Sequence, residues 1–260
     1  MNFKNLLYSK DSGIAIITIN RPEVRNAANQ ETMKELVDAF ALSDADDEVR
    51  VIIISGGNEK YFSSGAEVGT MEKSDVISMY DRVQRSKRTL LAVENCTKPV
   101  IAAASGYAFG FGFELLMCCD FLIIGDNAKF GLPEIGIGIM PGTGGTQRLT
   151  NLIGTSRAKQ VIMLGDRIDA EMALRWGLAY KVVPARETLV AAREIANTFV
   201  SKPGIALRFA KECINWAAVN GSSTGLEYEC AKFSMLYATD DQKEGMLAFR
   251  EKRQPAFSNQ

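Results

Sequence analysis

Short apolar strands alternate with helical stretches through the first half of the chain, and this alternation most limits the fold that the chain can adopt. The clearest helix is Gln30–Leu42, where Met33, Leu36, Val37 and Phe40 recur at helical spacing. The predicted strands are Ile14–Asn20, Val49–Ser55, Val100–Ala104 and Phe121–Gly125, each rich in apolar residues and closed near a proline or a glycine. Alternating strands and helices indicate the α/β class.

The last part of the chain has a different pattern. From Thr155 onward nearly every stretch has helical character, apart from a short predicted strand at Leu178–Val183. Beyond Lys202 and Pro203 only helices are predicted. We therefore expect a core over residues 1–200 that contains the functional site, and a helical region over residues 201–260.

The chain contains no histidine. Histidine is the side chain best suited to proton transfer near neutral pH and the commonest metal ligand. Its absence excludes Ser-His-Asp triads, His-paired cysteine nucleophiles and H-E-x-x-H zinc sites. Acid–base chemistry must then come from carboxylates, Lys, Tyr or Cys, and no metal site is expected.

Charge and cysteine content set further limits. The 30 Lys and Arg residues against 31 Asp and Glu residues give a net charge of −1, which offers no broad positive field for nucleic acid. The five cysteines contain no C-x-x-C pair, which favours a reducing compartment. The longest charge-free apolar stretch, Val100–Phe113, is shorter than the roughly 20 residues of a membrane helix, and Met1–Lys10 does not resemble a signal peptide. We expect a cytoplasmic protein with neither a nucleic-acid nor a membrane partner.

Three glycine-rich segments follow predicted strands. They are Tyr61–Gly69, Gly106–Glu114 and Phe130–Gly145. Glycine lets the backbone approach a ligand closely and turn its N–H groups into a cavity. No segment completes a phosphate-binding G-x-x-x-x-G-K-[ST] loop or a dinucleotide-binding G-x-G-x-x-G fingerprint, so kinase and hydride-transfer functions have little support.

Two glutamates lie in apolar, glycine-rich surroundings. Glu114 stands within G-F-G-F-E-L-L-M-C-C and Glu134 within L-P-E-I-G-I-G-I. Buried carboxylates need a partner or a role, so Glu114 is either tied to an amide or an arginine or used in chemistry. Glu134 could equally be an exposed turn residue. Together they predict a dry pocket in which paired carboxylates divide the acid and base roles.

Free backbone N–H groups are the second requirement for chemistry beside a carbonyl group. The glycine turn before Glu114 leads directly into a predicted helix, whose first N–H groups can hold a developing oxyanion. Ser64, Gly65 and Ala66 form a second loop of this kind. The two loops together predict an oxyanion hole.

Six segments then follow one another in a recognisable order. They are R-P-E-V-R-N-A-A-N at 21–29, Y-F-S-S-G-A-E at 61–67, K-P-V-I-A-A-A-S-G-Y-A-F-G-F-G-F-E-L at 98–115, F-G-L-P-E-I-G-I-G-I-M-P-G-T-G-G-T-Q-R-L at 130–149, A-L-R-W-G-L-A at 173–179 and E-G-M-L-A-F-R-E-K-R at 244–253. In these six segments, and so along essentially its whole length, the chain resembles the enoyl-CoA hydratase/isomerase family, also called the crotonase family. The resemblance implies a crotonase-like spiral core of ββα units. It also implies a C-terminal helical region that forms a homotrimer or a dimer of trimers.

The resemblance further implies a reaction and its residues. In family members that hydrate a double bond, two glutamates hold the catalytic water, and these match Glu114 and Glu134. The two oxyanion-hole amides match Ala66 and Phe111, and Gly142 matches a glycine whose backbone helps to position the water. The implied reaction is reversible syn addition of water to a trans-2-enoyl-CoA, giving a 3-hydroxyacyl-CoA, in fatty-acid or related acyl-CoA degradation. Coenzyme A is part of the acyl-CoA substrate, and no separate cofactor is implied.

Some residues depart from the family pattern. Phe111 replaces the central glycine of G-G-G, and its ring either shapes the acyl pocket or belongs to the core. Glu67 replaces the usual aspartate. Gly69 stands where relatives carry a lysine that contacts coenzyme A, for which Arg25 and the C-terminal Lys252 and Arg253 are candidate replacements. The residues implied to bind coenzyme A or substrate are Arg25, Ala27, Ser64, Ala66, Glu67, Val68, Phe111 and Lys252.

Three other functions stay open at this point. Double-bond isomerisation usually needs only the acid that matches Glu134, so the presence of Glu114 favours hydration. A specialised hydratase would act on a carnitine-type, branched or cyclic acyl-CoA. A non-catalytic protein on the same fold would bind RNA or a partner, and the Glu114–Glu134 pair argues against it.

Overall fold

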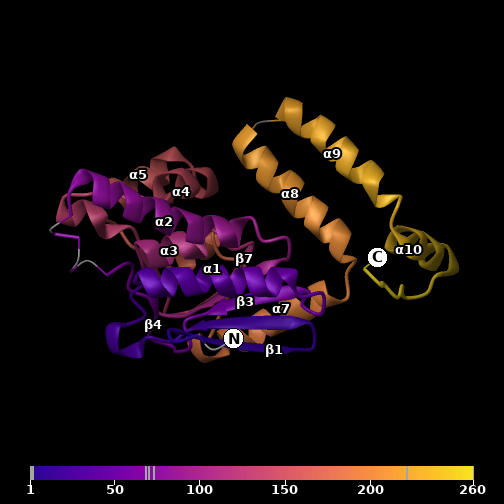
Figure 1. Ribbon diagram of the computed structural model, residues 1–260, viewed down its shortest axis with the longest axis horizontal. Helices are drawn as coiled ribbons and strands as arrows, with labels where there is room; N and C mark the ends of the chain where they lie inside the picture. Colours follow the sequence, from indigo (N-terminus) through magenta and orange to yellow (C-terminus); the bar gives the residue numbers. More distant parts are fainter. Residues whose placement is uncertain (1–2, 68, 70, 73, 221, 260) are drawn as a thin grey trace.

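The computed structural model describes residues 3–67, 69, 71–72, 74–220 and 222–259 (Figure 1). Two β-sheets with helices packed around them form a core that ends near residue 200. Three further helices extend from this core as a separate arm, at the right of Figure 1. The mixed α/β architecture is the one expected from the sequence.

The larger sheet has six strands in the spatial order β1-β2-β3-β5-β7-β10. They are β1 (Leu6–Asp11), β2 (Ile14–Ile19), β3 (Val51–Ser55), β5 (Val100–Ala104), β7 (Phe121–Gly125) and β10 (Lys181–Val183). Only β1 and β2 run antiparallel among these neighbours; the other pairs are parallel. The four strands predicted in the first half are present. The additional β1 lies at the edge and has a polar-rich sequence that carries little strand signal.

Both faces of the larger sheet are covered. Ile53 and Ile101 lie side by side in the register and pack with Ala192 of helix α7 (Thr188–Val200). The neighbouring residues Ile52 and Ile54 point into the main core on the other face. A parallel sheet buried on both faces needs continuous apolar strands, which explains why β3 and β5 were recognisable in the sequence.

A smaller sheet, of order β4-β6-β8-β9, carries the loops of the predicted site. Its strands are β4 (Tyr61–Ser63), β6 (Tyr107–Phe109), β8 (Lys129–Gly131) and β9 (Ile168–Asp169). Each of β4, β6 and β8 directly follows a strand of the larger sheet, so the chain repeats a strand–strand unit as it winds through the core. These strands were not predicted because two or three residues flanked by glycine and serine give no readable period.

The remaining core helices surround the two sheets. They are α1 (Gln30–Ala45), α2 (Val76–Glu94), α3 (Phe111–Leu116), α4 (Gly145–Ile153), α5 (Thr155–Met163) and α6 (Ala170–Arg175), with 3-10 turns η1 (Pro22–Val24), η2 (Pro133–Ile137) and η3 (Ala185–Glu187). Helix α1 packs on α2, and α3 contacts β4, β6, α2 and α4. These contacts place α3 in the middle of the core, with its first residues beside the smaller sheet.

The arm consists of α8 (Gly204–Asn220), α9 (Ser222–Leu236) and α10 (Asp240–Glu251). Large apolar side chains are exposed on it, including Ile214, Val219, Leu226, Phe233 and Phe249. The predicted boundary at residues 200 and 201 falls in the link between α7 and α8. The division into two domains stays a prediction.

No helix in the described part of the chain is both long and apolar enough to cross a membrane. All five cysteines are free thiols. Cys118 is buried, as expected of a small apolar residue, whereas Cys119 is only partly buried.

Candidate active site

Helix α3 begins at a backbone turn that only glycine adopts readily. Gly110 has φ 49° and ψ −125°, and it precedes Phe111, the first residue of the helix. A Cβ atom at Gly110 would stand 3.1 Å from Oε1 of Glu134. At Gly112 a Cβ atom would come within 2.7 Å of Cβ of Ser63. The glycines on both sides of Phe111 therefore let α3 start against β4 and beneath Glu134.

Glu114 is buried on α3, with an exposed fraction of 2%. Its Oε1 accepts hydrogen bonds from the backbone N–H groups of Thr143 (3.1 Å) and Gly145 (2.8 Å), and its Oε2 accepts one from the Thr143 hydroxyl. Three donors on one carboxyl group suit its ionised form, because an ionised carboxylate only accepts hydrogen bonds. Glu114 is thus tied to two backbone amides and a hydroxyl of the turn before α4.

Glu134 lies on η2 and is half-buried rather than an exposed turn residue. Its Oε2 is buried and has no hydrogen-bond partner in the described structure. Burial, together with the negative charge of Glu114, raises the pKa of Glu134 to about 6 against a smaller opposing effect of a backbone hydrogen bond. The charge of Glu114 therefore acts on Glu134, and the two carboxyl groups have different surroundings, as an acid–base pair requires.

Two backbone N–H groups face this part of the core without an acceptor among the described residues. One is that of Phe111, which as the first helical residue has no partner within α3. The other is that of Ala66. Its parallel bridge to Ala28 is made through the carbonyl of Gly65 and the N–H of Glu67, which leaves the Ala66 N–H unused.

The two loops that carry these N–H groups touch. Gly65 has φ 107°, and a Cβ atom there would stand 3.0 Å from the carbonyl oxygen of Phe109 and 3.9 Å from the nitrogen of Phe111. The structure thus brings together Ala66, Phe111, Glu114 and Glu134. The ring of Phe111 is 5% exposed and belongs to the main core, which is one of the two alternatives for this side chain.

Sequence reasoning missed the residues that hold Glu114. Gly142, implied to position water, is exposed and directly precedes Thr143. Thr143 and Gly145 supply all three hydrogen bonds to Glu114. The only sequence signal was the G-T-G-G run itself, which does not say which carboxylate it binds.

Asn26 is a second residue that the sequence did not single out. It is 1% exposed with φ 57°, and its side chain accepts from the N–H of Arg21 and donates to the carbonyls of Gly56 (2.9 Å) and Phe62 (3.0 Å). Asparagine tolerates this left-handed conformation better than most residues. Asn26 joins segment 21–29 to the loop that carries Ser64, whose N–H donates to the carbonyl of Arg25.

The residues implied to bind coenzyme A have varied surroundings. Arg25 is exposed and Ala27 half-buried, both beside the Ala66 loop. Glu67 forms an ion pair with Arg21 (Oε1 to Nη1, 2.7 Å) and Val68 lies outside the described residues. Gly69 faces open space, because no atom lies within 4 Å of a Cβ atom placed there.

Lys252 lies away from the site of its own chain. It follows α10, at the far end of the arm from α3 in Figure 1. A contact between Lys252 and a substrate in this site would therefore need another copy of the chain, as the family resemblance implies.

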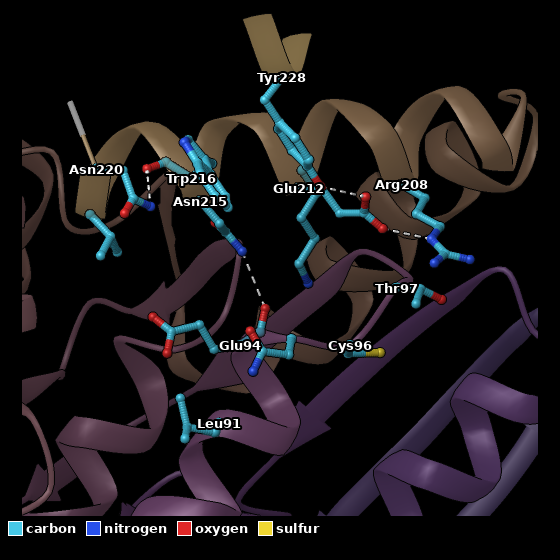
Figure 2. Close-up of a pocket in the computed structure, with 13 residues that line it drawn as sticks. Leu91, Glu94, Cys96, Thr97, Arg208, Glu212, Asn215, Trp216, Asn220 and Tyr228 are labelled. Carbon is cyan, nitrogen blue, oxygen red and sulfur yellow. Dashed lines mark hydrogen bonds and ion pairs between the residues drawn. The ribbon is translucent and has the colours of Figure 1, made fainter. Parts of the chain in front are cut away.

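Two cavities, of about 440 and 430 Å³, lie between the core and the arm. Figure 2 shows the first, between the end of α2 and helices α8 and α9, with Glu94, Trp216 and Tyr228 in its wall. The candidate site residues that the structure describes line neither cavity. No group of three or more Cys, Asp and Glu side chains within the described ranges could hold a metal ion.

Comparisons with known proteins show the family of the chain. A family model described as enoyl-CoA hydratase/isomerase matches residues 9–260. The chain is 40% identical over 257 residues to a crotonyl-CoA hydratase of Syntrophomonas wolfei, covering 99% of each protein. It is also 40% identical to a short-chain-enoyl-CoA hydratase of Clostridium acetobutylicum, covering 97% of each. Among solved structures, an enoyl-CoA hydratase from Bacillus anthracis superposes with a TM-score of 0.94 at 35% identity, covering 99% of this chain and 100% of that one.

Proposed function

The chain belongs to the enoyl-CoA hydratase/isomerase family, and from this premise we propose that it adds water reversibly to trans-2-enoyl-CoA thioesters. The enzyme is a hydro-lyase of the enoyl-CoA hydratase type. Water adds in the syn sense to give a 3-hydroxyacyl-CoA. The observation that supports this proposal is the pair of neighbouring carboxyl groups of Glu114 and Glu134. The Glu114 carboxyl group accepts three hydrogen bonds, whereas Oε2 of Glu134 has no hydrogen-bond partner in the described structure.

Glu114 acts as the base in this mechanism. Its carboxylate is surrounded by donors from Thr143 and Gly145 and is therefore suited to the ionised form. Glu114 takes a proton from the water that attacks C3. Gly142, whose backbone precedes Thr143, helps to position that water.

Glu134 acts as the acid. With a pKa of about 6, roughly one tenth of the carboxyl groups are protonated at pH 7, and the unpartnered Oε2 is free to donate that proton to C2. After turnover the proton taken up by Glu114 leaves to solvent or to Glu134, and both carboxyl groups return to their starting states.

The N–H groups of Ala66 and Phe111 form the oxyanion hole. Addition of hydroxide at C3 places negative charge on the thioester oxygen, and two unpaired N–H groups from touching loops can both donate to it. This role needs a backbone N–H at position 111 and no particular side chain there. The Phe111 ring therefore packs in the core, while its backbone N–H donates to the thioester oxygen.

The substrate is an acyl-CoA thioester, and the relatives named crotonyl-CoA hydratase and short-chain-enoyl-CoA hydratase support short acyl chains. We assign coenzyme A to the surface formed by Arg25, Ala27 and Ser64, with Lys252 supplied by a neighbouring copy. The mechanism needs no cofactor beyond the coenzyme A of the substrate. Fatty-acid or related acyl-CoA degradation is the corresponding role.

The arm supports assembly into a homotrimer, alone or as a dimer of trimers. Val219 and Phe249 are 80% and 86% exposed in the single chain, and such apolar side chains favour burial against another copy. We place the protein in the cytoplasm, because its five free cysteines suit a reducing compartment.

Steady-state assays with crotonyl-CoA and longer trans-2-enoyl-CoAs test this function. We expect loss of the conjugated thioester absorbance and formation of 3-hydroxyacyl-CoA by the wild type, and severe loss of both in Glu114→Gln. A matched control is Glu171→Gln, whose side chain is 83% exposed on α6. A well-folded protein that isomerises 3-enoyl-CoA but adds no water would overturn the hydratase proposal in favour of the isomerase.

A further inference from the structure

Thr143 lies between Glu114 and the half-buried Arg148. On one side its N–H and hydroxyl donate to Glu114. On the other side its carbonyl oxygen accepts a hydrogen bond of 2.9 Å from Nη1 of Arg148. The orientation of the peptide unit between Thr143 and Gly144, which lies between the two N–H groups that bind Glu114, therefore depends on the position of the Arg148 guanidinium.

Arg148 is in turn held by Glu94, the last residue of α2. Nη2 of Arg148 lies 2.7 Å from Oε2 of Glu94 and Nε lies 3.3 Å from Oε1, so the guanidinium meets both carboxylate oxygens. The two side chains are only 15% and 34% exposed. Such a two-point contact sets the direction of the guanidinium as well as its position.

The turn before α4 is shaped around these contacts. Gly144 has φ 116°, and a Cβ atom there would overlap Nη1 of Arg148. A Cβ atom at Gly145 would stand 3.0 Å from Oε1 of Glu114. The two glycines thus leave room for the guanidinium on one side of the turn and for the carboxylate on the other.

Glu94 is also fixed from outside the active site. Its backbone carbonyl accepts a hydrogen bond of 3.3 Å from Nδ2 of Asn215 on α8, as Figure 2 shows. Burial disfavours the charged form of Arg148, but hydrogen bonding to Glu94 and the negative charges of Glu94 and Glu114 outweigh it and raise the pKa of Arg148. Glu94 and Arg148 therefore form an ion pair of fixed geometry near the start of α4.

We propose that Arg148, held by Glu94, is a positioning residue for the base Glu114. It touches no reacting atom. By binding the Thr143 carbonyl it directs the donors of Thr143 and Gly145 at the Glu114 carboxylate, which keeps that carboxylate aimed at the water. This proposal rests on the hydratase function proposed above, because it assigns Arg148 to the same catalytic base.

The first test compares Arg148→Met with Arg175→Met, a control in which an arginine that is 61% exposed on α6 loses only a surface pair with Glu171. We expect kcat for crotonyl-CoA hydration to fall about 10- to 100-fold in Arg148→Met, because small displacements of a catalytic group have effects of this size. KM should change little, since the hydrogen bonds of Arg148 go to Glu94 and Thr143 and to none of the residues assigned to coenzyme A. Arg148→Lys, which keeps the charge but not the two-point contact, should recover part of the lost kcat.

The second test needs no substrate. Amide hydrogen exchange over residues 141–148 should be on the order of tenfold faster in Arg148→Met than in Arg175→Met, because the Thr143 carbonyl loses its donor and the turn no longer holds the Thr143 and Gly145 N–H groups in line with Glu114. If Arg148→Met does not fold, Arg148→Lys and Glu94→Gln carry both measurements, with smaller changes in the same direction.

Two results would overturn the proposal. One is a kcat of Arg148→Met within about twofold of the control, a difference too small for a displaced base. The other is a loss of kcat with unchanged exchange over residues 141–148. If the wild type hydrates no enoyl-CoA, the proposed function fails, whereas the exchange measurement still decides whether Arg148 fixes this segment.

Discussion

Gly145→Ala is expected to damage the catalytic base through steric contact alone. Gly145 opens α4 with an ordinary backbone conformation, so alanine brings no strain of the left-handed kind. Its Cβ atom would lie 2.9 Å from Cβ of Pro141, 3.0 Å from Cδ1 of Leu132 and 3.0 Å from Oε1 of Glu114. All three distances are shorter than ordinary van der Waals contact, so at least one neighbour must move.

The size of the effect follows from these contacts. Overpacking of this kind costs about 1–3 kcal/mol. Because each kcal/mol shifts Tm by about 2–4 °C in a chain of this size, we expect Tm to fall by several degrees. A displacement of Glu114 also lengthens its 2.8 Å hydrogen bond from the Gly145 N–H, and we expect kcat to fall about 10- to 100-fold.

The matched control is Gly136→Ala on η2, where no atom lies within 4 Å of the added Cβ atom. Steady-state hydration of crotonyl-CoA and thermal unfolding are measured for both variants and the wild type. We expect Gly136→Ala to behave as the wild type in both assays. Equal kcat values for Gly145→Ala and Gly136→Ala would refute the claim that the base depends on this close contact.

Three other perturbations give separate expectations. Burial raises the pKa of Glu134 from 4.5 to about 6, so the folded state favours its protonated form. The free energy of unfolding of the wild type should therefore decline as pH rises from 4.5 through 6. Denaturant unfolding of Glu134→Gln should show no such decline. Asn26→Asp places carboxylate oxygens against the carbonyls of Gly56 and Phe62, and we expect a loss of at least about 2 kcal/mol in the free energy of unfolding. Phe111→Leu should lower Tm yet leave kcat within about threefold, because the backbone N–H is retained and a core substitution of similar character costs only about 1 kcal/mol.

The larger sheet could be predicted because its strands are buried on both faces. β3 and β5 consist of Val, Ile and Ala apart from Ser55 at the end of β3, so composition alone marks them. β4 and β6 have three residues each beside glycine and serine, and pairing with distant segments, not their own sequence, makes them strands. The smaller sheet could therefore not be predicted from the sequence.

The site divides in a similar way. Glu114 stood out because a carboxylate in an apolar helix is costly unless it is bound. Its binding partners Thr143 and Gly145, and Arg148 behind Thr143, did not stand out, because a threonine, a glycine and an arginine are ordinary residues until the turn before α4 folds against α3. The raised pKa of Glu134 depends on burial and on the charge of Glu114, which likewise exist only in the folded chain.

The central claim is that Glu114 and Glu134 work as one acid–base unit. Its most direct test is kcat for crotonyl-CoA hydration in Glu114→Gln, Glu134→Gln and the double variant, each checked for wild-type thermal unfolding behaviour. We expect kcat to fall about 10²- to 10⁴-fold in each single variant. In the double variant, kcat should be only slightly lower than in the less active single variant. A folded single variant that keeps wild-type kcat, or losses that multiply in the double variant, would contradict the claim.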